Sequence, residues 1–319
     1  MSKLSSCLFA GILLLAAVSC TKPDNFRVLY WNIQNGMWDG QTDNYDRFVA
    51  WIREQNPDVC VFCEAETLYK TGTEYYLWRP DDEHYLPEHW PDVARRYGHD
   101  YVFLGGWRDD YPQVITSRYP IEGVALTGSA DTVVSHGAGW AKIQFKDKVL
   151  NMVSLHLWPQ KFGPDVSKED RQRSADAREG DYYRRQEIEY ICSHTINTVP
   201  PEKAAGQYWM MMGDFNSLSR VDNGVYQLPE DDSVFLVHDF IRDSTPYRDV
   251  THERHPEEFF TTIGYDYRID FVYCTQSLLD RIVSDRVVSD DYTTPVRDSQ
   301  TLYFWRPSDH RPIVVDLAL

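Results

Sequence analysis

Short apolar runs bounded by polar or turn residues recur along the chain. Runs of this length are typical of buried β-strands. In one segment, alternate apolar residues at 141, 143 and 145 precede a Lys-Asp-Lys turn, which predicts a hairpin with residues 150–157. Further strands are predicted at residues 26–31, 59–63, 207–212, 233–237, 269–274 and 312–317.

Two segments instead show helical spacing. Residues 43–56 place four apolar side chains at positions i, i+3, i+4 and i+7, and residues 182–197 repeat this spacing. Strands that mostly follow one another, with a few long helices, predict a layered α/β or α+β fold with sheets inside and helices outside. No repeat or Pro/Gly/Ser-rich linker divides the chain, so one domain over residues 26–319 is the simplest organisation.

Two stretches have little core signal. Residues 67–91 are rich in Tyr, Trp, Asp and Glu, and residues 160–181 are densely charged. Two interpretations remain open: solvated loops, or a rim that selects the substrate. Aromatic residues that could stack on bases or sugars, enter lipid, or simply pack are Trp78, Trp90, Trp107 and Trp158.

The first residues have the pattern of an export signal. Lys3 precedes an apolar run over residues 8–18, and small residues then lead to Cys20. We expect residues 1–19 to be a signal peptide, with Cys20 acylated as in a bacterial lipoprotein and residues 20–25 forming a short tether. An ordinary signal peptide cut nearby is the alternative. Either way the sequence predicts export, and acylation predicts a cell-envelope lipoprotein anchored to the membrane.

Composition narrows the chemistry. A net charge of −17 over 319 residues disfavours strong nonspecific binding to polyanions, but a divalent cation can still reverse the field locally around a phosphate. After Cys20 only four cysteines remain, which are too few for a disulfide framework. We expect Cys60 and Cys63 to be buried strand thiols rather than metal ligands.

Polar residues able to bind a metal, a phosphate or a proton stand at the ends of the predicted strands. If these strand ends share one edge of packed sheets, the side chains converge there. The residues concerned are Asn32, Glu64, His156, Asp214, Asn216, Asp270, Asp309 and His310.

Phosphoester hydrolysis would use every member of this set. A hard cation needs oxygen ligands, which Glu64 can supply with Asn32 and Asp309. An attacking water needs a base and an orienting amide, for which Asp214 and Asn216 are suited.

Imidazoles can serve the phosphate side of such a site. His156 and His310 can donate to the phosphoryl oxygens, and Asp270 can hold the second nitrogen of His310. Taken singly, each of these polar residues could instead be a turn residue, a strand cap or a structural histidine.

The order of these motifs resembles the endonuclease/exonuclease/phosphatase family, the deoxyribonuclease-I-like superfamily. The resemblance covers about residues 26–319. It rests on seven marks in order: Tyr-Trp-Asn32-Ile, Phe-Cys-Glu64, Ile-Thr-Ser117-Arg118-Tyr-Pro-Ile, Ser-Leu-His156-Leu, Gly-Asp214-Phe-Asn216-Ser, Arg268-Ile-Asp270-Phe-Val and Ser308-Asp309-His310-Arg-Pro-Ile.

The resemblance implies a four-layer sandwich of two packed mixed β-sheets flanked by helices, with the site at one sheet edge. It implies Mg²⁺ or Mn²⁺ at Glu64, with Asn32 and Asp309 close by. Cys63 stands where the family usually has Gln, and the tyrosine that abasic-site enzymes direct at the phosphate is not identifiable, which weakens a DNA-repair assignment.

The resemblance also implies roles for the other residues of the set. Asp214 and Asn216 would position the attacking water or the scissile phosphate. His310 paired with Asp270 would contact the phosphate, and His156 would assist the leaving oxygen.

These observations predict an exported, Mg²⁺-dependent phosphodiesterase or phosphatase. Nucleic acid, a phospholipid headgroup and a sugar phosphate are all possible substrates, and no protein partner is indicated. The alternative is a surface lipoprotein that uses the same fold to bind a glycan or another ligand without catalysis.

Overall fold

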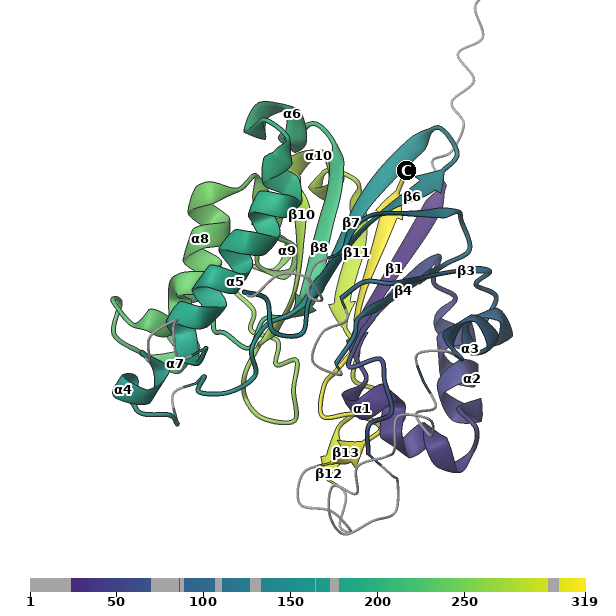
Figure 1. Cartoon of the computed structure of the whole chain (residues 1–319), viewed down its shortest axis with the longest axis horizontal. Helices are drawn as coiled ribbons and strands as arrows, with labels where there is room; N and C mark the ends of the chain where they lie inside the picture. The colour runs from purple at the N-terminus through teal and green to yellow at the C-terminus, as the bar shows by residue number, and fades with distance from the viewer. Residues whose placement is uncertain are drawn as a thin grey trace, which may run out of the picture.

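In the computed structural model, two mixed β-sheets pack face to face and helices flank them on both sides (Figure 1). The structure describes residues 24–69, 86, 89–106, 111–126, 133–163, 165–172, 178–297 and 304–319. This arrangement confirms the predicted sandwich. The predicted signal peptide and Cys20 lie outside the described residues.

The first sheet has the strand order β11-β14-β1-β2-β4-β3. Its central pair, β1 and β2, is parallel, and Asn32 is in register with Cys63. The strand β14 runs antiparallel to β1, with Ile313 opposite Tyr30. The strands are β1 (Asn25–Asn32), β2 (Val59–Cys63), β3 (Tyr101–Leu104), β4 (Val114–Ser117), β11 (Ile282–Val287) and β14 (Ile313–Ala318).

The second sheet has the order β5-β6-β7-β8-β10-β9. Here too one pair is parallel, β7 with β8, while β10 runs antiparallel to β8. The strands are β5 (Ile121–Leu126), β6 (Ala138–Phe145), β7 (Lys148–His156), β8 (Tyr208–Asp214), β9 (Tyr247–Asp249) and β10 (Asp270–Thr275), and a separate ribbon joins β12 (Val296–Arg297) to β13 (Trp305–Arg306).

The helices bury the faces that their periodicity predicts. The helix α2 (Asp46–Gln55) packs on the outer face of the first sheet and buries Phe48, Val49 and Ile52 there. The helix α5 (Gly180–His194) buries Ile188 against the second sheet. Each such side chain contributes about 1.5–3 kcal/mol by leaving water. The remaining helices are α1 (Gln34–Met37), α3 (Trp90–Arg96), α4 (Lys168–Arg171), α6 (Pro201–Ala205), α7 (Asn223–Tyr226), α8 (Leu236–Ser244), α9 (Val250–Arg254), α10 (Gln276–Leu279), and the 3-10 turns η1 (Trp38–Thr42), η4 (Ile196–Thr198), η5 (Arg220–Asp222) and η6 (Ser233–Phe235).

The prediction of a strand at residues 233–237 is wrong. These residues form η6 and the first turn of α8. The carboxylate of Asp232 accepts a hydrogen bond from the backbone N–H of Val234 at 3.0 Å and so starts a helical turn. A short apolar run fits a buried helix as well as a buried strand, and here the cap decides.

In the two stretches with little core signal, residues 67–91 and 160–181, some of the described residues are buried. Trp90 begins α3 and is fully buried, so it is a packing residue, whereas Trp78 and Trp107 lie outside the described residues. Within 160–181, α4 forms and both Arg171 and Asp181 are buried.

The four cysteines described by the structure, Cys60, Cys63, Cys192 and Cys274, are free and buried, as expected of structural thiols. Within the described part of the chain, no helix combines the length and the apolar character needed to cross a membrane.

Candidate active site

The sheet topology explains why distant polar residues meet. Parallel strands end at the same edge, so Asn32 at the end of β1 lies beside Glu64, which directly follows β2. In the second sheet, His156 and Asp214 are in register at the ends of β7 and β8. The antiparallel β10 begins at this edge, which places Asp270 opposite Asp214.

The predicted cation ligands lie on the side of the first sheet. The Asn32 side-chain amide donates to Glu64 Oε1 at 3.3 Å and to Asp214 Oδ2 at 3.1 Å. Glu64 Oε2 accepts from the backbone N–H of Asn35 at 3.0 Å. Burial and then the charge of Asp309 raise the pKa of Glu64. The carboxylates of Glu64 and Asp309 therefore repel each other in a partly buried place, and a divalent cation bound there would offset that repulsion.

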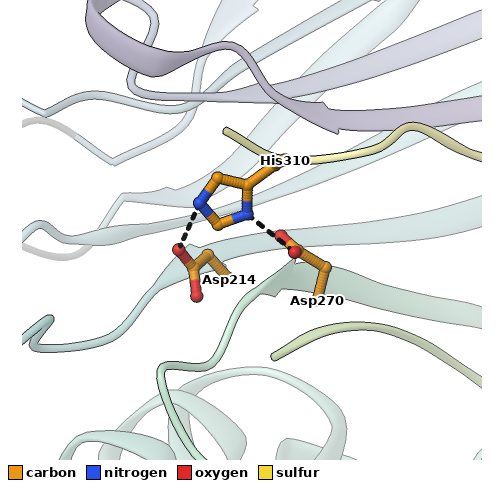
Figure 2. A group of neighbouring side chains, drawn as sticks. All are labelled: Asp214, Asp270 and His310. Carbon is orange, nitrogen blue, oxygen red and sulfur yellow. Dashed lines mark hydrogen bonds and ion pairs between the residues drawn. The ribbon is translucent and has the colours of Figure 1, made fainter. Parts of the chain in front are cut away.

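A hydrogen-bonded chain runs from the first sheet through the second sheet to His310. Tyr30 Oη donates to Asp270 Oδ1 at 2.7 Å. His310 Nδ1 donates to Asp270 Oδ2, also at 2.7 Å, and Figure 2 shows this pair. The Thr262 hydroxyl accepts from the backbone N–H of Asp270 at 3.1 Å. Burial alone would lower the pKa of His310, but the charges of Asp270 and Asp309 raise it well above its ordinary value. The two carboxylates therefore favour the protonated form of His310, and Asp270 orients its ring.

Asp214 lies between the two histidines. Its Oδ2 is 3.7 Å from His310 Nε2 and 3.7 Å from His156 Nε2. The backbone N–H of Asn216 donates to Asp214 Oδ1 at 3.0 Å, and the Asn216 amide donates to the carbonyl of Leu157. Burial, followed by the charge of Asp270, raises the pKa of Asp214 well above its usual range, as suits a proton acceptor.

His156 is almost fully buried, yet neither of its ring nitrogens has a hydrogen-bond partner among the described residues. Burial, and then the neighbouring His136 and His310, lower its pKa well below the ordinary value. A neutral imidazole with free nitrogens beside Asp214 is available to a ligand. The structure thus brings together the eight residues that the sequence singled out.

The side chains could hold a cation in two ways. Ligand atoms of Asp214, Asp270 and His310 lie within 4.8 Å of one another (Figure 2). However, His310 Nδ1 and Asp270 Oδ2 are already joined by a hydrogen bond of 2.7 Å. The oxygen donors of Glu64, Asn32 and Asp309 match the preference of Mg²⁺ better.

Sequence reasoning missed two contributors. Tyr30 stands in a predicted strand and in the first motif, but no role was predicted for its hydroxyl, although it holds Asp270. His136 lies beside His156, with ring centroids 4.6 Å apart. Its position follows from the pairing of β6: Ala138, where β6 begins, is opposite Leu155, so His136, two residues earlier, lies at the edge where β7 ends.

One of the seven motifs lies away from the site. Ser117 ends β4 opposite Val59, at the start of β2, and Arg118 contacts Asn56 and Asp58 there. This motif therefore stabilises the far edge of the first sheet rather than the candidate site.

Comparison with known proteins agrees with this geometry. The fold is similar to an AP endonuclease from Archaeoglobus fulgidus (TM-score 0.58, 17% identity, covering 92% of this chain and 100% of that one). It is also similar to an endonuclease/exonuclease/phosphatase from Beutenbergia cavernae DSM 12333, with a TM-score of 0.60 and 17% identity, covering 92% of this chain and 72% of that one. A third similar structure is truncated TDP2 from Caenorhabditis elegans, with a TM-score of 0.56 and 14% identity, covering 92% of this chain and 98% of that one. No curated protein sequence matches the chain significantly. The model of the Endonuclease/Exonuclease/phosphatase family matches residues 29–310, so the chain belongs to that family.

Proposed function

We propose that this protein is a Mg²⁺-dependent hydrolase of phosphoester bonds, with Mn²⁺ as a possible substitute. Members of its family are metal-dependent phosphoester hydrolases. The observation that carries the proposal is the meeting of an oxygen-donor set around Glu64 with the His310–Asp270 pair on either side of Asp214.

Glu64, Asp309 and the Asn32 carbonyl oxygen would hold the cation. When bound, the cation would supply Lewis-acid stabilisation of the charge that develops on the phosphoryl oxygens. The fit is supported by the raised pKa of Glu64, which burial and Asp309 cause, because a cation between these carboxylates would relieve both costs.

The protein's own groups would perform the rest of the reaction. Asp214, fixed by the Asn216 backbone N–H, would take the proton of the attacking water. His310, held by Asp270, would donate a hydrogen bond to a phosphoryl oxygen. His156 would face the leaving oxygen through one of its free ring nitrogens.

A hydrolysis panel tests this proposal. Plasmid DNA, RNA, sphingomyelin, sugar phosphates and bis-(p-nitrophenyl) phosphate would be offered with Mg²⁺, with Mn²⁺ and with EDTA. We expect at least one to be cleaved, and EDTA and Asp214→Ala to abolish cleavage. Asp147→Ala, in the exposed β6–β7 turn, is the matched control. Activity that survives both EDTA and Asp214→Ala would overturn the mechanism.

We also propose that the protein is exported and anchored through an acylated Cys20. The support is the lipobox-like pattern in the sequence. Asp24 directly precedes β1, at the end of the strand opposite Asn32, so such an anchor would attach at the end remote from the site. Fractionation of a Cys20→Ala variant tests this, because a variant that remains membrane-associated would contradict acylation.

A further inference from the structure

The helix α5 carries buried charges that the reaction described above does not use. The helix packs against the second sheet, and three of its charged side chains are at most 1% exposed: Asp181, Arg184 and Glu187. Buried charges are costly unless their hydrogen bonds are satisfied. The hydrogen-bond partners of these three side chains therefore indicate their role.

Glu187 connects two segments that border His156. Its Oε1 accepts from the backbone N–H and the hydroxyl of Ser135, at 2.8 and 2.5 Å. Its Oε2 accepts from the backbone N–H of Trp158 at 2.9 Å. One carboxylate thus fixes both the residue before His136 and the second residue after His156.

Arg184, one turn earlier, holds the same second segment. Its guanidinium donates to the carbonyls of Trp158, Gln160 and Lys161 at 3.0, 2.7 and 2.7 Å, while Asp181 accepts from it at 2.6 Å. Backbone atoms of a loop are therefore fixed by a helix rather than by a strand.

The held segments bring rings against His156. The rings of His136 and His156 have centroids 4.6 Å apart, and His136 stacks on Trp158 at 6.1 Å with an interplanar angle of 22°. His136 is 3% exposed, as deep as His156 at 2% and Asp214 at 2%. It therefore lies at the depth of the site itself and not on an outer rim.

We propose that His136 is a further substrate-contacting residue beside His156, and that Glu187 is its positioning residue. The inference rests on the proposed phosphoester hydrolysis. A second imidazole at this place gives the site another donor for an oxygen of the phosphoester. The three hydrogen bonds that the Glu187 carboxylate accepts would keep the His136 ring in place.

The roles of the two residues predict how substitutions should combine. His136→Asn removes the ring and should lower kcat about 10²–10³-fold, the range seen when one donor to a developing charge is lost. Glu187→Gln turns one acceptor oxygen into an amino group that faces an N–H, so it should displace a segment and lower kcat at least about tenfold. Because Glu187 acts through His136, the double variant should be no worse than His136→Asn within about threefold.

Kinetics on bis-(p-nitrophenyl) phosphate with saturating Mg²⁺ test this scheme. His136→Gln provides a second substitution, and circular dichroism checks the fold of each variant. Glu189→Gln is the matched control, because it makes the same change on an exposed carboxylate of α5 that pairs with Arg185, and it should leave kcat unchanged.

Each outcome decides the question. Folded His136 variants with kcat within twofold of wild type would overturn this inference alone. Independent, multiplicative losses in the double variant would overturn the positioning role of Glu187. A wild-type protein that cleaves no substrate would overturn the proposed function, and this inference with it.

Discussion

Replacement of Asp270 by Asn changes the central member of the hydrogen-bonded chain Tyr30–Asp270–His310. The carboxylate accepts from Tyr30 on one oxygen and from His310 on the other, both at 2.7 Å. An amide has one acceptor oxygen, which can accept from His310 Nδ1–H while the amino group donates to the Tyr30 hydroxyl. Asp270→Asn therefore chiefly removes the negative charge that favours the protonated form of His310.

The expected loss follows from these contacts. A hydrogen bond to a charged group contributes about 1.5–3 kcal/mol, or roughly 10–150-fold in rate if it acts only in the transition state. If His310 adopts the other tautomer, the loss can reach about 10⁴-fold, as in other carboxylate–histidine pairs. We therefore expect kcat to fall about 10–10⁴-fold in Asp270→Asn, with little change in Mg²⁺ affinity.

A second substitution makes the test specific. Tyr30→Phe removes one donor and should cost less than about tenfold in kcat. In the double variant the buried amide loses the hydroxyl that can accept from its amino group. We expect the double variant to be no more active than Asp270→Asn alone.

The assay is kcat at saturating Mg²⁺ for the three variants and wild type, with thermal unfolding as the control for folding. Asp270→Asn with more than a third of wild-type kcat would refute the assigned role of the pair. A double variant clearly more active than Asp270→Asn would refute the acceptor argument.

Three further predictions concern the metal, pH and the core. Glu64→Gln should weaken Mg²⁺ activation by more than about tenfold, and an unchanged Mg²⁺ titration would contradict the metal assignment. Burial lowers the pKa of His99 from 6.5 to about 4. The unfolded chain therefore binds a proton at higher pH than the folded one, and stability should fall by about 3 kcal/mol as pH drops from about 6.5 to 4. Urea unfolding measures this, and His99→Gln should remove the corresponding part of the pH dependence. Arg268→Met leaves the buried Asp222 and Asp249 without the cation that contacts them at 2.9 and 2.7 Å, and should cost about 3–5 kcal/mol; a loss below about 1 kcal/mol would contradict this reasoning.

Most of the sheet framework could be predicted from the sequence, because strands buried on both faces read as continuous apolar runs. The runs before Asn32, Glu64 and Asp214 are of this kind, and their ends could be expected to meet. The segment at 233–237 failed because four apolar residues do not distinguish helix from strand, and the deciding cap at Asp232 was not used.

Contacts between the two sheets could not be predicted in the same way. The hydrogen bond from Tyr30 on β1 to Asp270 on β10 joins residues 240 positions apart in different sheets. Local periodicity fixes which face a side chain occupies, but not which residue of another sheet it meets. The carboxylate that holds His310 could be proposed from its motif, whereas the hydroxyl that holds that carboxylate could not.

The start of α5 shows that a departure from the apolar pattern can itself carry information. From Ile188 onward the helix follows the expected apolar spacing, but its first turns bury Asp181, Arg184 and Glu187. A helix selected only for stability would place apolar side chains there, since buried charges cost free energy. Here they bind the backbone of the segments around His136 and Trp158. Charged residues on the inward face of a predicted helix therefore identify the places where a fold supports a site and not only its own core.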